Sequence, residues 1–109
     1  MEEREISKIL FIRKEKLLVR VDMEKLLFVK SEGNYLQLHF AHDKYLLREK
    51  LGAFLATLPA SSFIRVHRRF VVNLQKIEII GSGFLTLIGH EIPVSATYKD
   101  ALMERVEII

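Results

Sequence analysis

The chain has no cysteine and no tryptophan, and only two of its 109 residues are proline. The absence of cysteine excludes a disulfide framework, thiolate metal ligands and a cysteine nucleophile. It suits a reducing compartment, and we expect a cytoplasmic protein. No apolar run approaches the roughly 18 residues that span a bilayer, and the charged start over 2–5 does not resemble a signal peptide. We therefore expect no membrane partner.

Patterns that carry catalysis or bind cofactors are equally scarce. The histidines form no pair at positions i and i+4 and no H-E-x-x-H motif. No serine lies in a G-x-S-x-G setting, and no P-loop or G-x-G-x-x-G loop is present to hold phosphates. The carboxylates are scattered, mostly beside lysines. We therefore expect no enzyme activity, no cofactor and no metal site.

What remains is the composition of a folded domain. Hydrophobic residues make up 50% of the sequence, which is enough to build a buried core. A length of 109 residues suits one domain and is too short for two. We expect a tail or the end of a linker over 1–8 and a single domain over 9–109.

Most of the chain has the patterns of short strands. Residues 8–22 predict a hairpin that turns around Lys14–Lys16. Residues 36–40 alternate between apolar and polar side chains, which is the period of a half-buried strand, and 45–49 form its return strand. A second hairpin turns at Gly81–Gly83, and a turn over 89–91 leads into a last extended segment.

Two short helices complete the expected fold, whose class is mainly β. The first has an apolar face spaced for a helix and is ended by Pro59; the face consists of Leu47, Leu51, Phe54, Leu55 and Leu58. The second begins after Ser95, whose hydroxyl is expected to cap it. Its apolar face consists of Tyr98, Leu102 and Val106.

Positive charge is concentrated in one part of the chain, although the formal net charge is only +3. Residues 50–77 contain no acid and five basic residues, which are Lys50, Arg65, Arg68, Arg69 and Lys76. Elsewhere 12 basic residues stand against 14 acidic ones. A basic face on a mildly acidic body is typical of proteins that bind polyanions. A solvated edge strand whose charges discourage pairing is an equal alternative.

The densest basic segment, RVHRRFVVN, has an extended pattern in which alternate residues share a face. Arg65, His67 and Arg69 are then expected to point outward, and a bend or loop re-aims Arg68. Arginine pairs bidentately with phosphate and reads guanine in the major groove. RNA readers usually stack bases on exposed aromatics, which this sequence offers little of, so the pattern favours duplex DNA. A protein-interaction module with an acidic partner and an RNA-binding module remain alternatives.

Three segments in register resemble one family. LLFVKSEGNYLQLHF, FIRVHRRFVVNLQKI and IPVSATYKDAL have the order and spacing of the LytTR-type DNA-binding domain of bacterial transcription (response) regulators, over about Ile9 to Val106. The resemblance implies an elongated multi-sheet β fold whose edge loops enter successive major grooves of promoter DNA. It also implies a place in a two-component system, with an upstream receiver domain outside this chain and dimers on paired DNA repeats.

The resemblance places base contacts on three loops, at Asn34 in EGNY, Arg68 in VHRRF and Thr97 after PVS. Backbone or auxiliary contacts fall on Arg48, Lys50, His67, Arg69, Tyr98 and Lys99. The chain departs from the family pattern in two places. Ala96 and Thr97 follow PVS, where the family commonly has an arginine, and Arg69 lies where a small polar residue is common. We therefore expect a sequence preference that differs from that of typical members.

Several residues have a structural interpretation beside the functional one. Asn34 suits a tight turn as well as a base contact. Tyr35 is interpreted as a packed strand residue, and Asn73 as a tie to local backbone. Phe54 and Phe84 are expected in the core.

Overall fold

Short antiparallel strands make up most of the regular secondary structure of the described residues. The computed structural model describes residues 9–109, so the tail expected over 1–8 lies outside the described residues. Two 3-10 helices, η1 (Met23–Lys25) and η2 (Leu74–Lys76), precede β3 and follow β7. The other elements are β1 (Leu10–Lys14), β2 (Leu17–Val21), β3 (Phe28–Glu32), β4 (Tyr35–His39), β5 (Lys44–Leu47), α1 (Leu51–Leu55), β6 (Phe63–His67), β7 (Phe70–Asn73), β8 (Ile79–Ile80), β9 (Phe84–Leu87), β10 (His90–Pro93) and α2 (Ala96–Met103).

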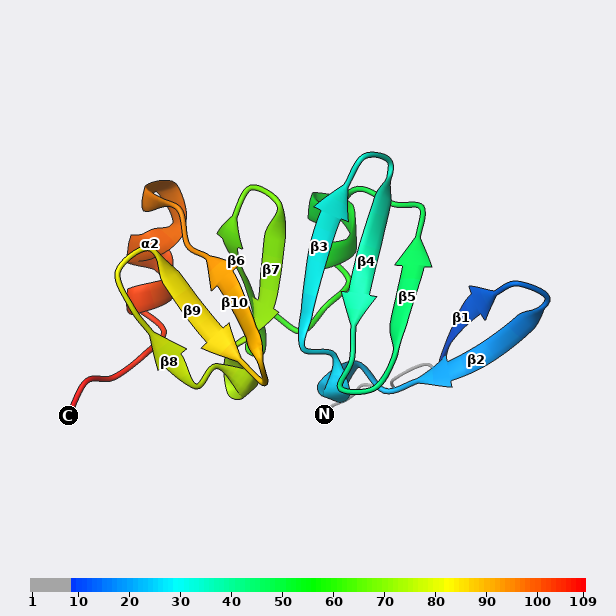
Figure 1. Cartoon of the computed structure of the whole chain (residues 1–109), viewed down its shortest axis with the longest axis horizontal. Coiled ribbons are helices and arrows are strands. Elements are labelled where there is room, and N and C mark those ends of the chain that lie inside the picture. Colours follow the sequence, from blue (N-terminus) through cyan, green and yellow to red (C-terminus); the bar gives the residue numbers. More distant parts are fainter. Residues whose placement is uncertain (1–8) are drawn as a thin grey trace, which may run out of the picture.

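These strands form three sheets. The middle sheet has the order β5-β4-β3-β7-β6, the hairpin β1–β2 stands alone, and the third sheet has the order β10-β9-β8. Figure 1 shows the three sheets following one another along the longest axis of a molecule that measures 44 × 39 × 24 Å. The structure confirms the expected fold class, mainly β with several sheets and short helices, and both predicted hairpins.

Both faces of the middle sheet are buried, because successive residues of its central strands pack into different cores. Val29 and Val71 belong to a core that also contains Leu51 of α1. Phe28 and Val72 point into a second core, which contains apolar residues of β9, β10 and α2. Each fully buried aliphatic side chain contributes about 1.5–3 kcal/mol to folding. The middle sheet is therefore held from both sides.

The first helix is shorter than the sequence predicted. It spans Leu51–Leu55, and Leu47 lies in β5, where it pairs with Leu36 of β4. The prediction that Leu47 belongs to the helix is wrong, because a core-facing strand residue stands four positions before Leu51 and mimics the helical spacing. Leu58 is buried in the turn that precedes Pro59.

The second helix begins after Ser95 as predicted but ends at Met103, so Val106 lies beyond it. Ser95 occupies the N-cap position without a side-chain capping hydrogen bond, so the capping that the sequence predicted is not formed. Leu102 is fully buried and Tyr98 is half-buried, which confirms that part of the predicted apolar face. The helix packs on β6.

The two phenylalanines expected in the core are only half-buried. Phe54 packs against the edge of the first core. The ring of Phe84 lies directly over Gly81, where a Cβ atom would collide with it. This close approach explains the glycine at the start of the β8–β9 turn.

Asn73 ties the end of β7 to the segment that leads into β3. Its side chain is 2% exposed. The Nδ2 group donates to the carbonyls of Leu26 at 2.9 Å and Glu24 at 3.3 Å, and Oδ1 accepts from the backbone N–H of Gln75 at 3.0 Å. The structural role predicted for Asn73 is confirmed.

Replacing Asn73 by alanine should destabilise the domain by about 1–3 kcal/mol, because buried backbone groups lose their partners. Urea unfolding followed by circular dichroism measures this change. The matched control is Asn34→Ala, which lies at an exposed turn and should change stability by no more than about 0.5 kcal/mol. Equal unfolding midpoints for the two variants would contradict the structural role of Asn73.

His39 lies where the middle sheet meets the third sheet. Its ring stacks on Phe28 with 4.2 Å between centroids, and the ring of His90 approaches edge-on at 5.7 Å. Burial, together with the charges of His90, Lys44 and Lys30, lowers the pKa of His39 from 6.5 to about 4. The His39 ring is therefore uncharged at neutral pH.

This lowered pKa predicts a pH dependence of stability. The unfolded chain protonates His39 near pH 6.5, whereas the folded domain resists protonation until about pH 4. The contribution of His39 to the free energy of unfolding is therefore fully present above pH 6.5, and it is lost as the pH falls toward 4. Thermal unfolding of the His39→Phe variant should show a weaker decline between about pH 6.5 and 5 than the unaltered domain. The control variant His42→Gln, at an exposed site, should retain the full decline in stability. If stability falls with pH in parallel for His39→Phe and the unaltered domain, His39 is not the source of the decline.

Candidate nucleic-acid interface

The basic segment RVHRRFVVN forms a hairpin, so the extended pattern predicted for it is interrupted in its middle. β6 ends at His67, β7 begins at Phe70, and Arg68 and Arg69 form the turn between them. The ladder register shifts between Arg65 and His67, which marks a β-bulge. The loop that was expected to re-aim Arg68 is this turn.

Side-chain hydrogen bonds hold this turn in shape. Two-residue hairpin turns usually need positive φ angles, and neither Arg68 nor Arg69 is among the described residues that have one. The Nε atom of Arg65 donates to the carbonyl of His67 at 3.4 Å, and its Nη2 donates to the carbonyl of Arg68. His67 Nδ1 accepts from the backbone N–H of Arg69 at 3.1 Å. Arg65 is therefore half-buried within the turn instead of pointing outward as predicted.

The β3–β4 turn is built by its backbone instead. The strands pair up to Glu32 and Tyr35, which leaves Gly33 and Asn34 as the two turn residues. Gly33 has a φ of 61°, in the left-handed region, as the first residue of a type II′ turn requires. Tyr35 is 44% exposed, so its interpretation as a packed residue is wrong. Its ring lies 5.9 Å from the guanidinium of Arg48.

The start of α2 completes this edge of the molecule. The backbone N–H of Ser95 donates to a carbonyl of β6 at 3.0 Å, and the guanidinium of Arg65 lies 5.8 Å from the ring centroid of Tyr98. Figure 1 shows the β3–β4 turn, the β6–β7 turn and the start of α2 at the same edge of the sheets, together with the segment between β5 and α1. We call these four segments the loop edge.

The residues predicted to contact bases all lie on the loop edge and are exposed: Asn34 in the β3–β4 turn, Arg68 in the β6–β7 turn and Thr97 at the start of α2. Arg48 and Lys50 are exposed in the segment between β5 and α1. The structure thus brings together residues that lie up to 63 positions apart in the sequence.

The other predicted contacts differ in how free their side chains are. Lys99 is exposed in the first turns of α2. His67 and Tyr98 are half-buried, and His67 is engaged by the backbone of Arg69. The Nε atom of Arg69 donates to the carbonyl of Ser31 at 3.0 Å. These three side chains therefore hold the loop edge together.

The positive stretch over 50–77 does not form one face. Lys76 lies in η2, at the end of β7 opposite the β6–β7 turn. Next to the loop edge, at the end of β3, Glu32 lies 3.6 Å from the Nζ of Lys30. Within the loop edge, Glu49 accepts from the backbone N–H of Lys50. The prediction of a single basic face is therefore only partly right.

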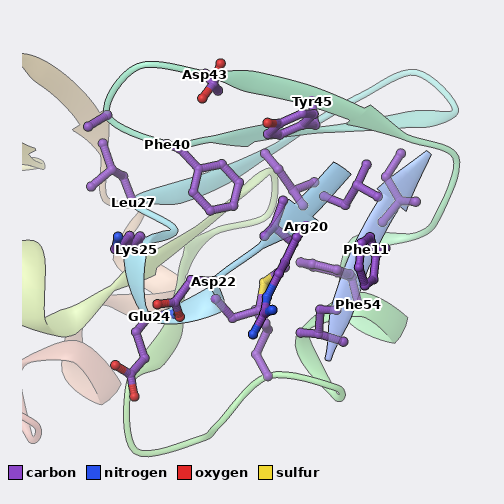
Figure 2. A pocket seen from close by; sticks show the side chains of 18 of the residues that line it. Phe11, Arg20, Asp22, Glu24, Lys25, Leu27, Phe40, Asp43, Tyr45 and Phe54 are labelled. Carbon is purple, nitrogen blue, oxygen red and sulfur yellow. The ribbon is translucent and has the colours of Figure 1, made fainter. Parts of the chain in front are cut away.

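A groove opens away from the loop edge, between the β1–β2 hairpin and the middle sheet (Figure 2). Phe11 and Arg20 line it from the hairpin, and Phe40, Tyr45 and Phe54 line it from the other side. It reaches η1 and η2, at the strand ends opposite the turns. Within residues 9–109 no three acidic, histidine or cysteine side chains are placed to hold a metal ion, and no helix is long and apolar enough to cross a membrane.

Adjacent loops that display arginine, lysine, amide and hydroxyl groups from a β scaffold are typical of nucleic-acid-binding domains. Residues 15–107 match the LytTr DNA-binding domain family, and the chain belongs to that family. This membership establishes the chain as a DNA-binding domain.

The chain is also similar to curated relatives in sequence and to a solved structure in fold. The sensory transduction protein LytT of Bacillus subtilis is 34% identical over 84% of this chain and 40% of its own length. A response regulatory protein of Vibrio cholerae is 38% identical over 59% of this chain and 26% of its own length. The LytTr DNA-binding domain of a Bacillus cereus response regulator has the same fold, with a TM-score of 0.82 at 21% identity, over 94% of this chain and 99% of that one. The chain thus spans about two fifths of the LytT protein that it matches.

The sequence patterns missed the role of Arg65, because the β-bulge that turns its side chain into the hairpin leaves no local signal. They also missed Ser31, whose carbonyl accepts a hydrogen bond from the Arg69 side chain and whose N–H donates to the Arg69 carbonyl. A period of two predicts which face a side chain occupies, but it does not predict which carbonyl a long side chain reaches.

Proposed function

We propose that the exposed side chains of the loop edge read a specific duplex DNA sequence, with the three loops entering successive major grooves. The observation that carries this proposal is that the turns that contain Asn34 and Arg68 lie at the same edge as the start of α2, which contains Thr97, and that all three residues are exposed. Asparagine pairs with adenine N6 and N7, arginine with guanine O6 and N7, and threonine contacts a thymine methyl group. Each side chain therefore has a base edge that suits it.

Phosphate contacts come from the flanks of the same edge. Arg48, Lys50 and Lys99 are exposed cations beside the three loops. His67, Arg69 and Tyr98 have an auxiliary role beside these cations, because parts of their side chains are already engaged in holding the loops. Such contacts set the orientation on the duplex and add affinity without sequence information.

We further propose that the domain is the output domain of a two-component response regulator in the bacterial cytoplasm. Its relatives are named as sensory transduction and response regulatory proteins, and they are longer than this chain. A receiver domain upstream would bring two DNA-binding domains together when phosphorylated, which suits paired DNA repeats. The domain acts by binding and has no catalytic step in this scheme.

Selection from a random duplex DNA library at near-physiological salt, with sequencing of the bound pool, tests this function. The expected result is a short enriched motif, repeated about one helical turn apart or at a multiple of that distance. Binding without any enriched motif would contradict sequence-specific reading. It would leave RNA or an acidic protein as the partner of the basic loops.

Replacing Arg68 by alanine should weaken binding to the selected site by about 1–3 kcal/mol and relax the preference at one base position. The reason is that a bidentate contact to a base edge is lost. The turn keeps its shape, because Arg65 binds the backbone carbonyl of residue 68, which alanine retains. Affinities for the selected site and for random duplex measure the effect. An equal loss on both duplexes would reduce Arg68 to a phosphate contact.

Replacing Lys50 by alanine should instead weaken binding to all duplexes by a similar factor. A lost phosphate contact releases about one fewer counterion, so the slope of log affinity against log salt should flatten by about one. A salt titration on the selected site and on random duplex measures this slope. An unchanged slope would remove Lys50 from the interface.

A further inference from the structure

The ladder between β3 and β7 ends in an incomplete residue pair. Phe28, Val29 and Lys30 of β3 pair with Val72, Val71 and Phe70 of β7. The next pair is Ser31 with Arg69, and the N–H of Ser31 donates to the carbonyl of Arg69 at 2.8 Å. In a regular antiparallel ladder the N–H of Arg69 would return a bond to the carbonyl of Ser31. It donates to His67 Nδ1 instead.

The side chain of Arg69 supplies the missing bond. Its Nε atom donates to the carbonyl of Ser31 at 3.0 Å, which is the carbonyl that the diverted N–H would have reached. The backbone N–H of Arg69 is thus free to shape the β6–β7 turn through His67. Two hydrogen bonds therefore still join β3 to Arg69 at the last residue pair, next to the β3–β4 turn.

We propose that Arg69 is a positioning residue, which fixes the β3–β4 and β6–β7 turns relative to one another and thereby sets the spacing of Asn34 and Arg68. The expected effect of Arg69 on DNA selectivity rests on the proposed function. The expected effect of Arg69 on the two turns of the free domain does not. Arg69 is exposed, so a single hydrogen bond contributes little to global stability. Its importance lies in the local geometry of two loops at the end of a ladder, where strands open most easily.

Three substitutions separate this role from a phosphate contact. The amide nitrogen of glutamine is as many bonds from Cα as the Nε of arginine, so Arg69→Gln retains a donor at that reach without the charge. Arg69→Lys retains the charge but has no donor at that position, and Arg69→Met retains only the apolar stem. A positioning role requires the donor, whereas a phosphate contact requires the charge.

The first measurement needs no DNA. In the free domain, hydrogen exchange at the Ser31 amide and over residues 32–35 should be faster in Arg69→Met and Arg69→Lys than in the unaltered domain. Arg69→Gln should restore the protection. The urea midpoint, measured on all four proteins, should stay nearly constant. Equal exchange in all four proteins would overturn the proposal.

The second measurement is the ratio of affinity for the selected site to affinity for random duplex at fixed salt. Arg69→Met and Arg69→Lys should lower this ratio by about tenfold, while Arg69→Gln stays near the unaltered value. A ratio that survives in Arg69→Lys and falls in Arg69→Gln would instead identify a phosphate contact and overturn the positioning role. If the unaltered domain selects no DNA site, the proposed function fails, and the exchange measurement still decides the role of Arg69.

Discussion

The antiparallel pairing of β3 with β7 is the constraint on which the loop edge depends. These strands lie about forty residues apart in the sequence; β3 continues through a tight turn into β4, and β7 follows β6 after another tight turn. Both faces of the pair are buried, with Phe28 and Val72 in one core and Val29 and Val71 in the other. A slip of one residue would send each side chain into the wrong core. Burial therefore fixes the register, and the register fixes how far each turn projects.

Arginine serves two purposes within one short segment. The turn after β6 lacks the glycine or asparagine that lets a two-residue hairpin turn adopt positive φ angles, so its carbonyls need other partners. Arg65 binds two of those carbonyls, and its planar group also lies against Tyr98 of α2. A lysine has one nitrogen and cannot make these contacts together. Arg68 is exposed at the tip of the turn that these hydrogen bonds hold in shape.

The sequence predicts the local features of this fold and misses those that depend on long-range pairing. Alternation over 36–40 and glycine at 81 and 83 predicted strands and a turn, because neighbouring residues decide them. Leu47 was assigned to a helix because one core-facing strand residue matched the helical period. The turn at Arg68 has no glycine, proline or asparagine to indicate it. The meeting of three loops came only from the family resemblance, since no local pattern encodes the pairing of β3 with β7.

The low net charge of the chain as a whole bears on how such a domain discriminates among sequences. Non-specific binding to DNA comes almost entirely from neutralised phosphates, and it grows with the number of cations at the interface. Here Arg65 is occupied within the turn, Lys30 lies beside Glu32, and the formal net charge of the chain is only +3. A weak non-specific background raises the ratio between correct and random sites for the same base contacts. Under the proposed function, discrimination depends on how accurately the scaffold spaces Asn34, Arg68 and Thr97, and buried strands together with the Arg69–Ser31 hydrogen bond hold the turns that carry the first two.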